Sequence, residues 1–300
     1  MTRTVHYALV IFNVYQKPFG KEIETMLSEK FELLGKGLYN GTIPDVLTLK
    51  SIPTASELDY VGSEDFDKVM IEKILPMAVE EKIDFNNLLE IDYQWLCRCL
   101  RILNYGPYHT VNTIFCSNCK TTSHGEYTVN LYTVDCVPLP AGFKNNIVIS
   151  KDEFIDFDGD VVLYLPTIRD IMTAYADTAF TNGEGEIDRE LARICYCIKQ
   201  LGKSTGMTPF EVKMTILEKF SAADYQILKQ VMNDVTNYGL RIAGKCQCPK
   251  CKTTDATFIV LTDDKFFRPT LGDLRAWKAD RKNSSAGRDE KPTGSSTENI

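Results

Sequence analysis

The sequence predicts an α+β protein in which helical segments are interleaved with two zinc-knuckle β-hairpins. Apolar residues recur at helical spacing over 87–103 and again over 167–237. Around these stretches, β-branched and aromatic residues alternate as they do in strands. Two short turns, Cys116-Ser-Asn-Cys119 and Cys246-Gln-Cys248-Pro-Lys-Cys251, stand where strands are expected to end. Together these patterns define three parts: an N-terminal segment over 1–60, a zinc-clipped α+β core over 61–280, and a disordered tail over 281–300.

The N-terminal segment, 1–60, is mixed in character, because its short apolar runs are broken by Gly and Pro and show no regular period. The apolar run 7–12 lacks the length and the small-residue cleavage site of a signal peptide, so it is interpreted as a strand. No stretch of 18 or more apolar residues occurs in the sequence, and no transmembrane helix is expected.

The core is expected to open with two helices. The first begins at Ser63, with acidic residues in its first turn that suit the helix dipole, and ends or bends at Pro76. The second, over 87–103, has a wide apolar face and stops at Gly106.

Strands and further helices follow. Strands are expected over 110–115, 127–134, 161–165 and 256–261. Helices are expected over 168–180, over 187–201, from the capping box of Thr208 and Glu211, and from Ser221 to near Tyr238. The segment from Asn283 to the C-terminus is rich in Ser, Gly, Lys and Glu and contains no large hydrophobe before Ile300, which is typical of a disordered tail.

The two cysteine knuckles predict one structural Zn²⁺ site, held by Cys116, Cys119, Cys248 and Cys251. A Cys-x-x-Cys turn brings two sulfurs to one ion, and four thiolates complete a tetrahedral site. Cys248 comes 129 positions after Cys119 (248 minus 119), so a shared ion would clip two distant segments together. Cys246 is an alternative ligand, because Cys-Gln-Cys offers a second sulfur at that knuckle.

Other interpretations of the knuckles stay open at this point. The thiols could be free, the two knuckles could bind separate ions, and His124 could replace one cysteine. A dithiol redox role would require a helix N-terminus beside the first knuckle, where the sequence predicts strands instead. A catalytic zinc would require an open position, typically with His or Glu among its ligands.

Composition excludes several classes of function. The net charge of −7 lacks the Lys/Arg surplus of a general phosphate-backbone binder, so nucleic acid is not expected as a partner. No nucleophile–base pair is evident, which favours a protein that is not an enzyme and has no small-molecule substrate. The acidic run Asp156-Phe-Asp158-Gly-Asp160 lacks calcium-loop spacing and is interpreted as a polar turn. The i, i+2 cysteine pairs 97/99 and 195/197 are interpreted as buried thiols, typical of a reducing compartment.

The order of motifs supplies a resemblance. The run Leu100-Arg101-Ile-Leu-Asn-Tyr105-Gly106 precedes the first knuckle, and Phe266-Phe267-Arg-Pro269 follows the second. Over roughly 60–270 this order resembles the baseplate family of T-even-like contractile-tailed bacteriophages, although Ser117 stands where that family often has Pro. The resemblance implies a baseplate hub subunit or a hub assembly factor, without enzymatic activity. It also implies other tail and baseplate proteins as partners, and a location in the virion tail after assembly in the host cytoplasm.

Phe266 and Phe267 are the candidate partner contacts. Adjacent aromatics on a strand point to opposite faces, so one is expected to pack inward and the other to face a partner. Two rival functions stay open: an assembly chaperone absent from the virion, and a zinc-ribbon nucleic-acid-binding regulator. The regulator is suggested by Lys120, Lys250 and Lys252, which lie beside the knuckles.

Overall fold

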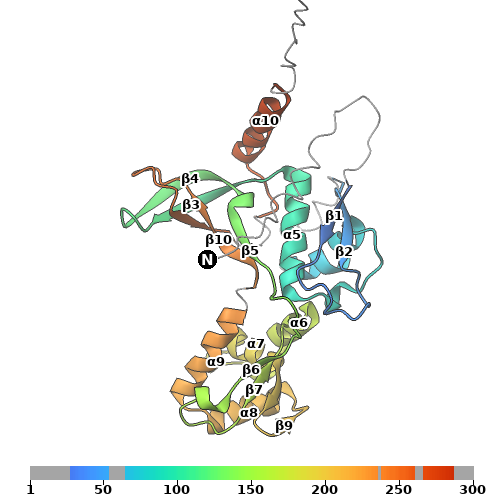
Figure 1. Ribbon diagram of the computed structural model, residues 1–300, viewed down its shortest axis with the longest axis vertical. Coiled ribbons are helices and arrows are strands. Elements are labelled where there is room, and N and C mark those ends of the chain that lie inside the picture. The colour runs from blue at the N-terminus through green and yellow to red at the C-terminus, as the bar shows by residue number, and fades with distance from the viewer. Residues whose placement is uncertain (1–27, 54–64, 236–237, 261–265, 287–300) are drawn as a thin grey trace, which may run out of the picture. The chain divides into compact units, whose positions relative to one another are not determined.

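The computed structural model describes residues 28–53, 65–235, 238–260 and 266–286 (Figure 1). The expected strand over 7–12, the helix start at Ser63 and the tail beyond 286 lie outside these residues. No helix within the described ranges combines the length and the apolar character needed to cross a membrane.

The chain forms two compact units that interleave along the sequence. Unit 1 comprises Met1–Glu24, Arg101–Val134 and Ala243–Ile300, and unit 2 comprises Thr25–Leu100 and Asp135–Ile242. Each unit is therefore built from segments far apart in the sequence, and its stability depends on long-range packing.

A five-stranded sheet carries both knuckles, in the order β4-β3-β11-β10-β5. Its strands are β3 (Tyr108–Cys116), β4 (Thr121–Asn130), β5 (Val134–Val137), β10 (Gly239–Cys246) and β11 (Ala256–Ile259). β3 and β4 form one antiparallel hairpin, and β10 and β11 form the other. Antiparallel pairing of β11 with β3 joins the hairpins side by side. The sequence predicted β3, β4 and β11 by range, and it predicted a strand ending at the second knuckle, where β10 lies, without bounds.

Gly244 leaves room for an aromatic ring on the buried face of this sheet. It lies directly opposite Phe258 in the β10–β11 register, and both residues are buried. A Cβ at position 244 would come within 2.3 Å of the Phe258 ring, so only glycine leaves room for that ring. Covering a strand glycine with a cross-strand aromatic restores the packing that the missing side chain would have supplied.

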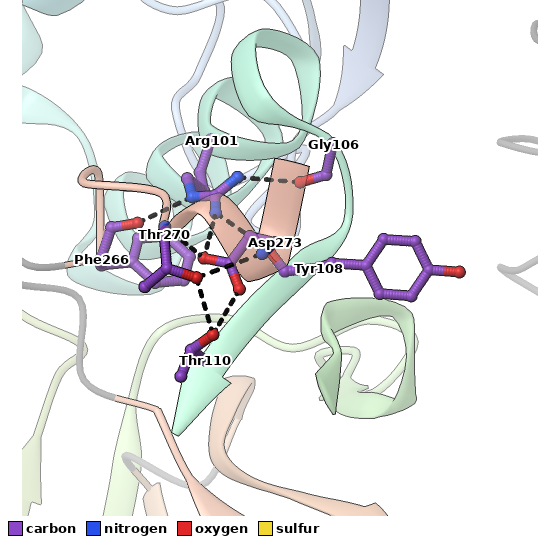
Figure 2. Close-up of polar contacts among 7 residues, drawn as sticks. All are labelled: Arg101, Gly106, Tyr108, Thr110, Phe266, Thr270 and Asp273. Carbon is purple, nitrogen blue, oxygen red and sulfur yellow. Dashed lines mark hydrogen bonds and ion pairs between the residues drawn. The ribbon is translucent and has the colours of Figure 1, made fainter. Parts of the chain in front are cut away.

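A buried arginine organises the rest of unit 1 (Figure 2). The guanidinium of Arg101 donates from Nε to the Phe266 carbonyl at 2.8 Å, and to the Gly106 and Tyr108 carbonyls at 2.9 Å each. The carboxylate of Asp273 lies 3.7 Å from the same group, and neither side chain is exposed. The planar fork of arginine can serve several acceptors in fixed directions, which the compact ammonium of lysine cannot.

Helix α10 (Leu271–Ala286) follows, and the sequence analysis did not predict it. Thr270 and Asp273 form its start, because the Thr270 N–H donates to the Asp273 carboxylate and the Asp273 N–H donates to the Thr270 hydroxyl. Trp277 packs against Gly106, where a Cβ would meet the indole at 2.5 Å. The predicted disordered tail was therefore wrong over 281–286, which continue this helix.

Unit 2 opens with a hairpin and a helical stretch that the sequence described only in part. The hairpin consists of β1 (Ser28–Glu32) and β2 (Val46–Lys50). The helical stretch runs through α3 (Phe66–Val69), a π-helical turn and α4 (Leu75–Ala78). Pro76 does not end it, because α4 continues past this residue to Ala78. The π-helical turn directly before it marks the change expected there.

The long helix α5 (Glu90–Tyr105) confirms the strongest helical prediction. Its Asp92 is fully buried and holds the chain after β1: the carboxylate accepts from the N–H groups of Leu34 and Gly35 and from the Tyr39 hydroxyl. Burial comes first among the causes that raise the pKa of Asp92, while these hydrogen bonds lower it.

A second core in unit 2 joins a small sheet to four helices (Figure 1). The sheet order is β6-β7-β8-β9, with β6 (Ile147–Ile149), β7 (Val161–Leu163), β8 (Ile198–Leu201) and β9 (Ser204–Thr205). The helices are α6 (Ile168–Ala176), α7 (Arg189–Cys197), α8 (Pro209–Lys219) and α9 (Ala222–Val235). The single helix predicted over 187–201 was wrong at its C-terminal end, because 198–201 pair with β7 as a strand. Pairing across the sheet outweighed local helical pattern there.

Candidate metal centre

Both knuckles lie at the same end of the five-stranded sheet. In the strand register, Cys116 faces Thr121 on one side and Ala256 on the other, and Ala256 faces Cys246. The turn between β3 and β4 and the turn between β10 and β11 therefore leave the sheet side by side. Sheet pairing brings together cysteines that are more than a hundred residues apart.

The four predicted ligands converge. The Sγ atoms of Cys116, Cys119, Cys248 and Cys251 all lie within 4.8 Å of one another. The Cys116 and Cys251 sulfurs are 3.6 Å apart, and the Cys119 and Cys248 sulfurs are 3.8 Å apart. A tetrahedral ion with metal–sulfur bonds of about 2.3 Å requires neighbouring sulfurs roughly 3.8 Å apart. The cluster thus fits a structural metal site with sulfur ligands.

The two turns share a backbone feature. The residue after the second cysteine of each knuckle has positive φ, at 51° for Lys120 and 63° for Lys252. A non-glycine residue adopts this conformation seldom. At the second knuckle, Cys248 donates its N–H to the Thr253 carbonyl at 2.7 Å, and Lys252 donates to the Cys248 carbonyl at 3.1 Å. These bonds close a tight turn around the sulfur.

Polar neighbours favour thiolates in the second knuckle. The Thr253 N–H lowers the pKa of Cys251 to about 6, and the Asn118 amide donates to the same sulfur at 3.7 Å. The Cys251 N–H is the main group that lowers the pKa of Cys248. Since a metal ligand must be the thiolate, N–H groups aimed at sulfur prepare the site for a cation.

Cys116 behaves differently. The Cys119 N–H lowers the pKa of Cys116, but burial and hydrogen bonds with neighbouring thiols outweigh it and raise the pKa to about 11. A bound metal would take the place of the proton on such a thiol, because each ligand must be a thiolate.

Two other candidate ligands lie outside the cluster. Cys246 is the last residue of β10 and is paired with Ala256, and it is not among the four clustered sulfurs. His124 is exposed on β4, with Nδ1 3.4 Å from the Thr113 hydroxyl. Within the described residues, all four ligand atoms of the cluster are sulfur. A set of four thiolates leaves a tetrahedral ion no open position for water or substrate.

The remaining cysteines of the helices are buried thiols. Burial raises the pKa of Cys195 to about 12, and it is the largest cause of the raised pKa of Cys97, Cys99 and Cys197. All four are buried and unpaired with one another. Apolar surroundings that hold a thiol protonated make it a poor nucleophile.

The prediction for Phe266 and Phe267 was wrong, because both side chains are only 1% exposed. They lie in a turn, not in a strand, so the alternation of strand side chains does not apply. The two rings meet edge to face at 5.4 Å, and the Phe266 ring meets His109 at the same distance. Phe266 and Phe267 form part of the core of unit 1, so neither offers a surface to a partner.

Arg101 and Asp273 are the structural residues that the sequence analysis missed. An arginine inside an apolar helical run was the available signal, since an arginine there has to find buried acceptors. The sequence Thr270-x-x-Asp273 after a proline was the signal for α10, because it matches a helix start. Comparison of the chain with known protein families, curated proteins and solved structures found no match.

Proposed function

We propose that this protein is a non-enzymatic structural subunit of a contractile phage tail baseplate, of the hub type. A Zn²⁺ ion held by the four clustered cysteines fixes the two hairpins, and the protein acts through contacts with other baseplate proteins. The resemblance in motif order suggests this class, and the structure contributes a physical reason why those motifs occur together.

The contact between the two most specific motifs carries the proposal. Arg101 belongs to the run before the first knuckle, and Phe266 to the run after the second. The Arg101 guanidinium joins them through a 2.8 Å hydrogen bond across 165 positions of sequence. Gly106 belongs to the same group of contacts, because its carbonyl accepts a hydrogen bond from Arg101 and the indole of Trp277 packs against its Cα. The motifs therefore form one buried assembly beside the sheet, as expected for residues that maintain a shape and do not perform chemistry.

The choice of zinc follows from the donor set. Soft thiolates in tetrahedral arrangement suit Zn²⁺ or an iron–sulfur group among the common metals. The sulfur separations of 3.6 and 3.8 Å match the edges of a single-ion tetrahedron. Binding of the ion would contribute directly to the stability of unit 1, because the unfolded chain offers no assembled site.

Metal content tests the site. Elemental mass spectrometry on protein purified without added metal should find one zinc per chain. Cys248→Ser should lose that zinc and lower the melting temperature. Cys246→Ser, two positions earlier at the end of β10, is the matched control and should retain zinc. Zinc that survives Cys248→Ser, or that is lost only in Cys246→Ser, would contradict the assigned ligands.

Particle composition tests the function. Mass spectrometry of purified tailed particles, taken from the phage that encodes this chain, should detect the chain at a fixed ratio to other tail proteins. A chain needed for tail assembly but missing from the particle would instead identify an assembly chaperone. If the chain is missing from the particle and tails assemble normally without it, both the structural subunit and the assembly chaperone are ruled out.

A further inference from the structure

The two units carry opposite net charge. Unit 1 has 16 Lys and Arg residues against 11 Asp and Glu, a net charge of +5. Unit 2 has 18 Lys and Arg residues against 30 Asp and Glu, a net charge of −12. The overall −7 therefore conceals a basic unit and a strongly acidic unit in one chain. Surfaces of opposite sign attract over distances of about a Debye length, near 10 Å at 0.1 M salt.

Unit 1 exposes one face of its sheet, which we call the open sheet face. Phe115 on β3 is 49% exposed and Ile259 on β11 is 60% exposed. The strand register places Thr257 beside Phe115 and Lys245 beside Thr257, so Lys245 lies on the same face. Its members with exposed side chains include Thr113, Phe115, Thr122, His124, Lys245 and Ile259, and the exposed Glu126 lies two positions after His124 on β4.

Unit 2 exposes a segment of complementary character, which we call the acidic loop and which spans 152–160. Five acidic residues are exposed in it: Asp152, Glu153, Asp156, Asp158 and Asp160. Ile155 stands among them with 69% of its side chain exposed. An isoleucine so exposed within a run of carboxylates is an apolar knob surrounded by negative charge.

The acidic loop is held in shape by one buried carboxylate. Asp224 at the start of α9 accepts from the N–H groups of Ile155 at 2.6 Å, Asp156 at 3.2 Å and Phe157 at 3.1 Å. Phe157 stacks on Phe220 at 4.3 Å, which anchors the loop from beneath. A knob presented on a preorganised loop loses little conformational entropy when it docks.

We propose that the acidic loop of one copy docks on the open sheet face of a second copy. Ile155 would pack against Phe115 and Ile259, and the surrounding carboxylates would lie toward Lys245 and the positive charge of unit 1. Because the two surfaces differ, the contact is head-to-tail, so one copy keeps a free open sheet face and the other keeps a free acidic loop. The contact stands on charge and exposure alone and does not require the proposed tail function.

A nucleic-acid strand fits the open sheet face less well. Lys245 lies on the same face as the exposed Phe115 and Ile259, so this face offers apolar contact area and not the row of cations that a phosphate backbone needs. A second copy supplies both the negative charge and the apolar group that Phe115 and Ile259 lack.

Sedimentation equilibrium of the zinc-loaded full chain tests the contact. At low salt the average mass should rise with concentration above the 34.0 kDa of one chain, and about 1 M salt should reverse most of that rise. Ile155→Ser and Lys245→Glu should each weaken association at least about tenfold. Two controls should leave it near the wild-type value: Val46→Ser, which removes another exposed apolar side chain of unit 2, and Lys203→Glu, which makes the same charge change within unit 2.

Mixing the two variants separates a head-to-tail contact from a symmetric one. The Lys245→Glu chain retains its acidic loop, and the Ile155→Ser chain retains its open sheet face. An equimolar mixture should therefore form a dimer of twice 34.0 kDa that neither variant forms alone. A wild-type chain that stays monomeric at all concentrations, or a mixture that stays monomeric, would overturn the proposal. So would a single-stranded DNA oligonucleotide that binds a monomeric wild type and loses binding with Lys245→Glu.

Discussion

At the level of single residues, Arg101 and Asp273 form an ion pair that is completely withdrawn from water. The pair is compensated by three carbonyl groups that accept from the guanidinium, so its cost of burial is met by directed hydrogen bonds. A lysine in place of Arg101 would leave several of those carbonyls without a donor.

Arg101→Lys should destabilise the protein by at least about 1–3 kcal/mol, the cost of leaving one buried carbonyl without a donor, although lysine keeps the positive charge. Urea unfolding followed by circular dichroism measures this change. Arg169→Lys is the matched control, because Arg169 pairs with Asp84 at the surface and such pairs contribute about 0–1 kcal/mol. Equal effects of the two substitutions would show that the Arg101 network contributes no more than a surface pair.

Gly244 is the second residue whose identity the packing decides. Gly244→Ala would place a methyl group 2.3 Å from Phe258, and the ring would have to leave its position. We expect a loss of about 1–3 kcal/mol in the free energy of unfolding, as for an overpacked core. Gly183→Ala, with no atom within 4 Å of the added Cβ, should change stability little. An unchanged Gly244→Ala protein would mean that β10 and β11 do not pair in this register.

At the level of elements, Asp224 joins α9 to the acidic loop. Burial raises the pKa of Asp224, but hydrogen bonds from Ile155, Ser221 and Asp156 together lower it by more. The pKa of Asp224 therefore lies below the usual value. A lowered carboxyl pKa stabilises the fold above the unfolded pKa of about 4, and that stability is lost as the pH falls through the folded pKa.

Asp224→Asn should therefore cost stability at neutral pH and progressively less in acid. The difference in unfolding free energy between wild type and Asp224→Asn should stay constant from about pH 5 to 8 and shrink below about pH 4. Urea titrations at each pH measure it. Asp234→Asn, an exposed residue at the other end of α9, serves as the control. A difference that grows toward acid pH would contradict the assigned role of the carboxylate.

Helix α10 is an element whose removal should expose the buried arginine. A chain that ends after Ala286 should melt like the full chain. A chain that ends after Thr270 loses Asp273 and Trp277, so Arg101 would keep its charge without its carboxylate. Calorimetry should show a clearly lower melting temperature for the shorter chain alone. Equal melting of the two truncated proteins would mean that α10 contributes nothing to unit 1.

At the level of the whole molecule, the cysteine cluster lies in unit 1, and the core that joins β6, β7 and β8 to the helices α6 to α9 lies in unit 2. Removal of the metal with a chelator should raise amide exchange in β3, β4, β10 and β11. The helices α6 to α9 of unit 2 should keep their protection, because their core does not depend on the ion. Hydrogen-exchange mass spectrometry with and without chelator measures this. Loss of protection throughout both units would show that the chain unfolds as one cooperative body.

Sequence patterns predicted most elements whose signal is local. The helix α5 has apolar residues at helical spacing over its whole length. Thr208 and Glu211 have the spacing of a capping box, and Cys116 and Cys119 have the spacing of a cysteine knuckle. Each of these patterns depends on residues a few positions apart, so the chain itself reveals them. β8 was misread as the end of a helix, because its apolar residues suit either structure and pairing with β7 decided between them.

The sequence by itself indicated the α+β class, the four cysteines that cluster and most helix starts. Only the tertiary structure decided that Phe266 and Phe267 are buried, that Arg101 meets Asp273, and that charge is divided between two interleaved units. A Cys-x-x-Cys turn places two sulfurs for one tetrahedral ion, so the sequence shows this pattern within a few residues. Burial, a buried ion pair and a charged face instead depend on segments that meet only after the sheet has formed.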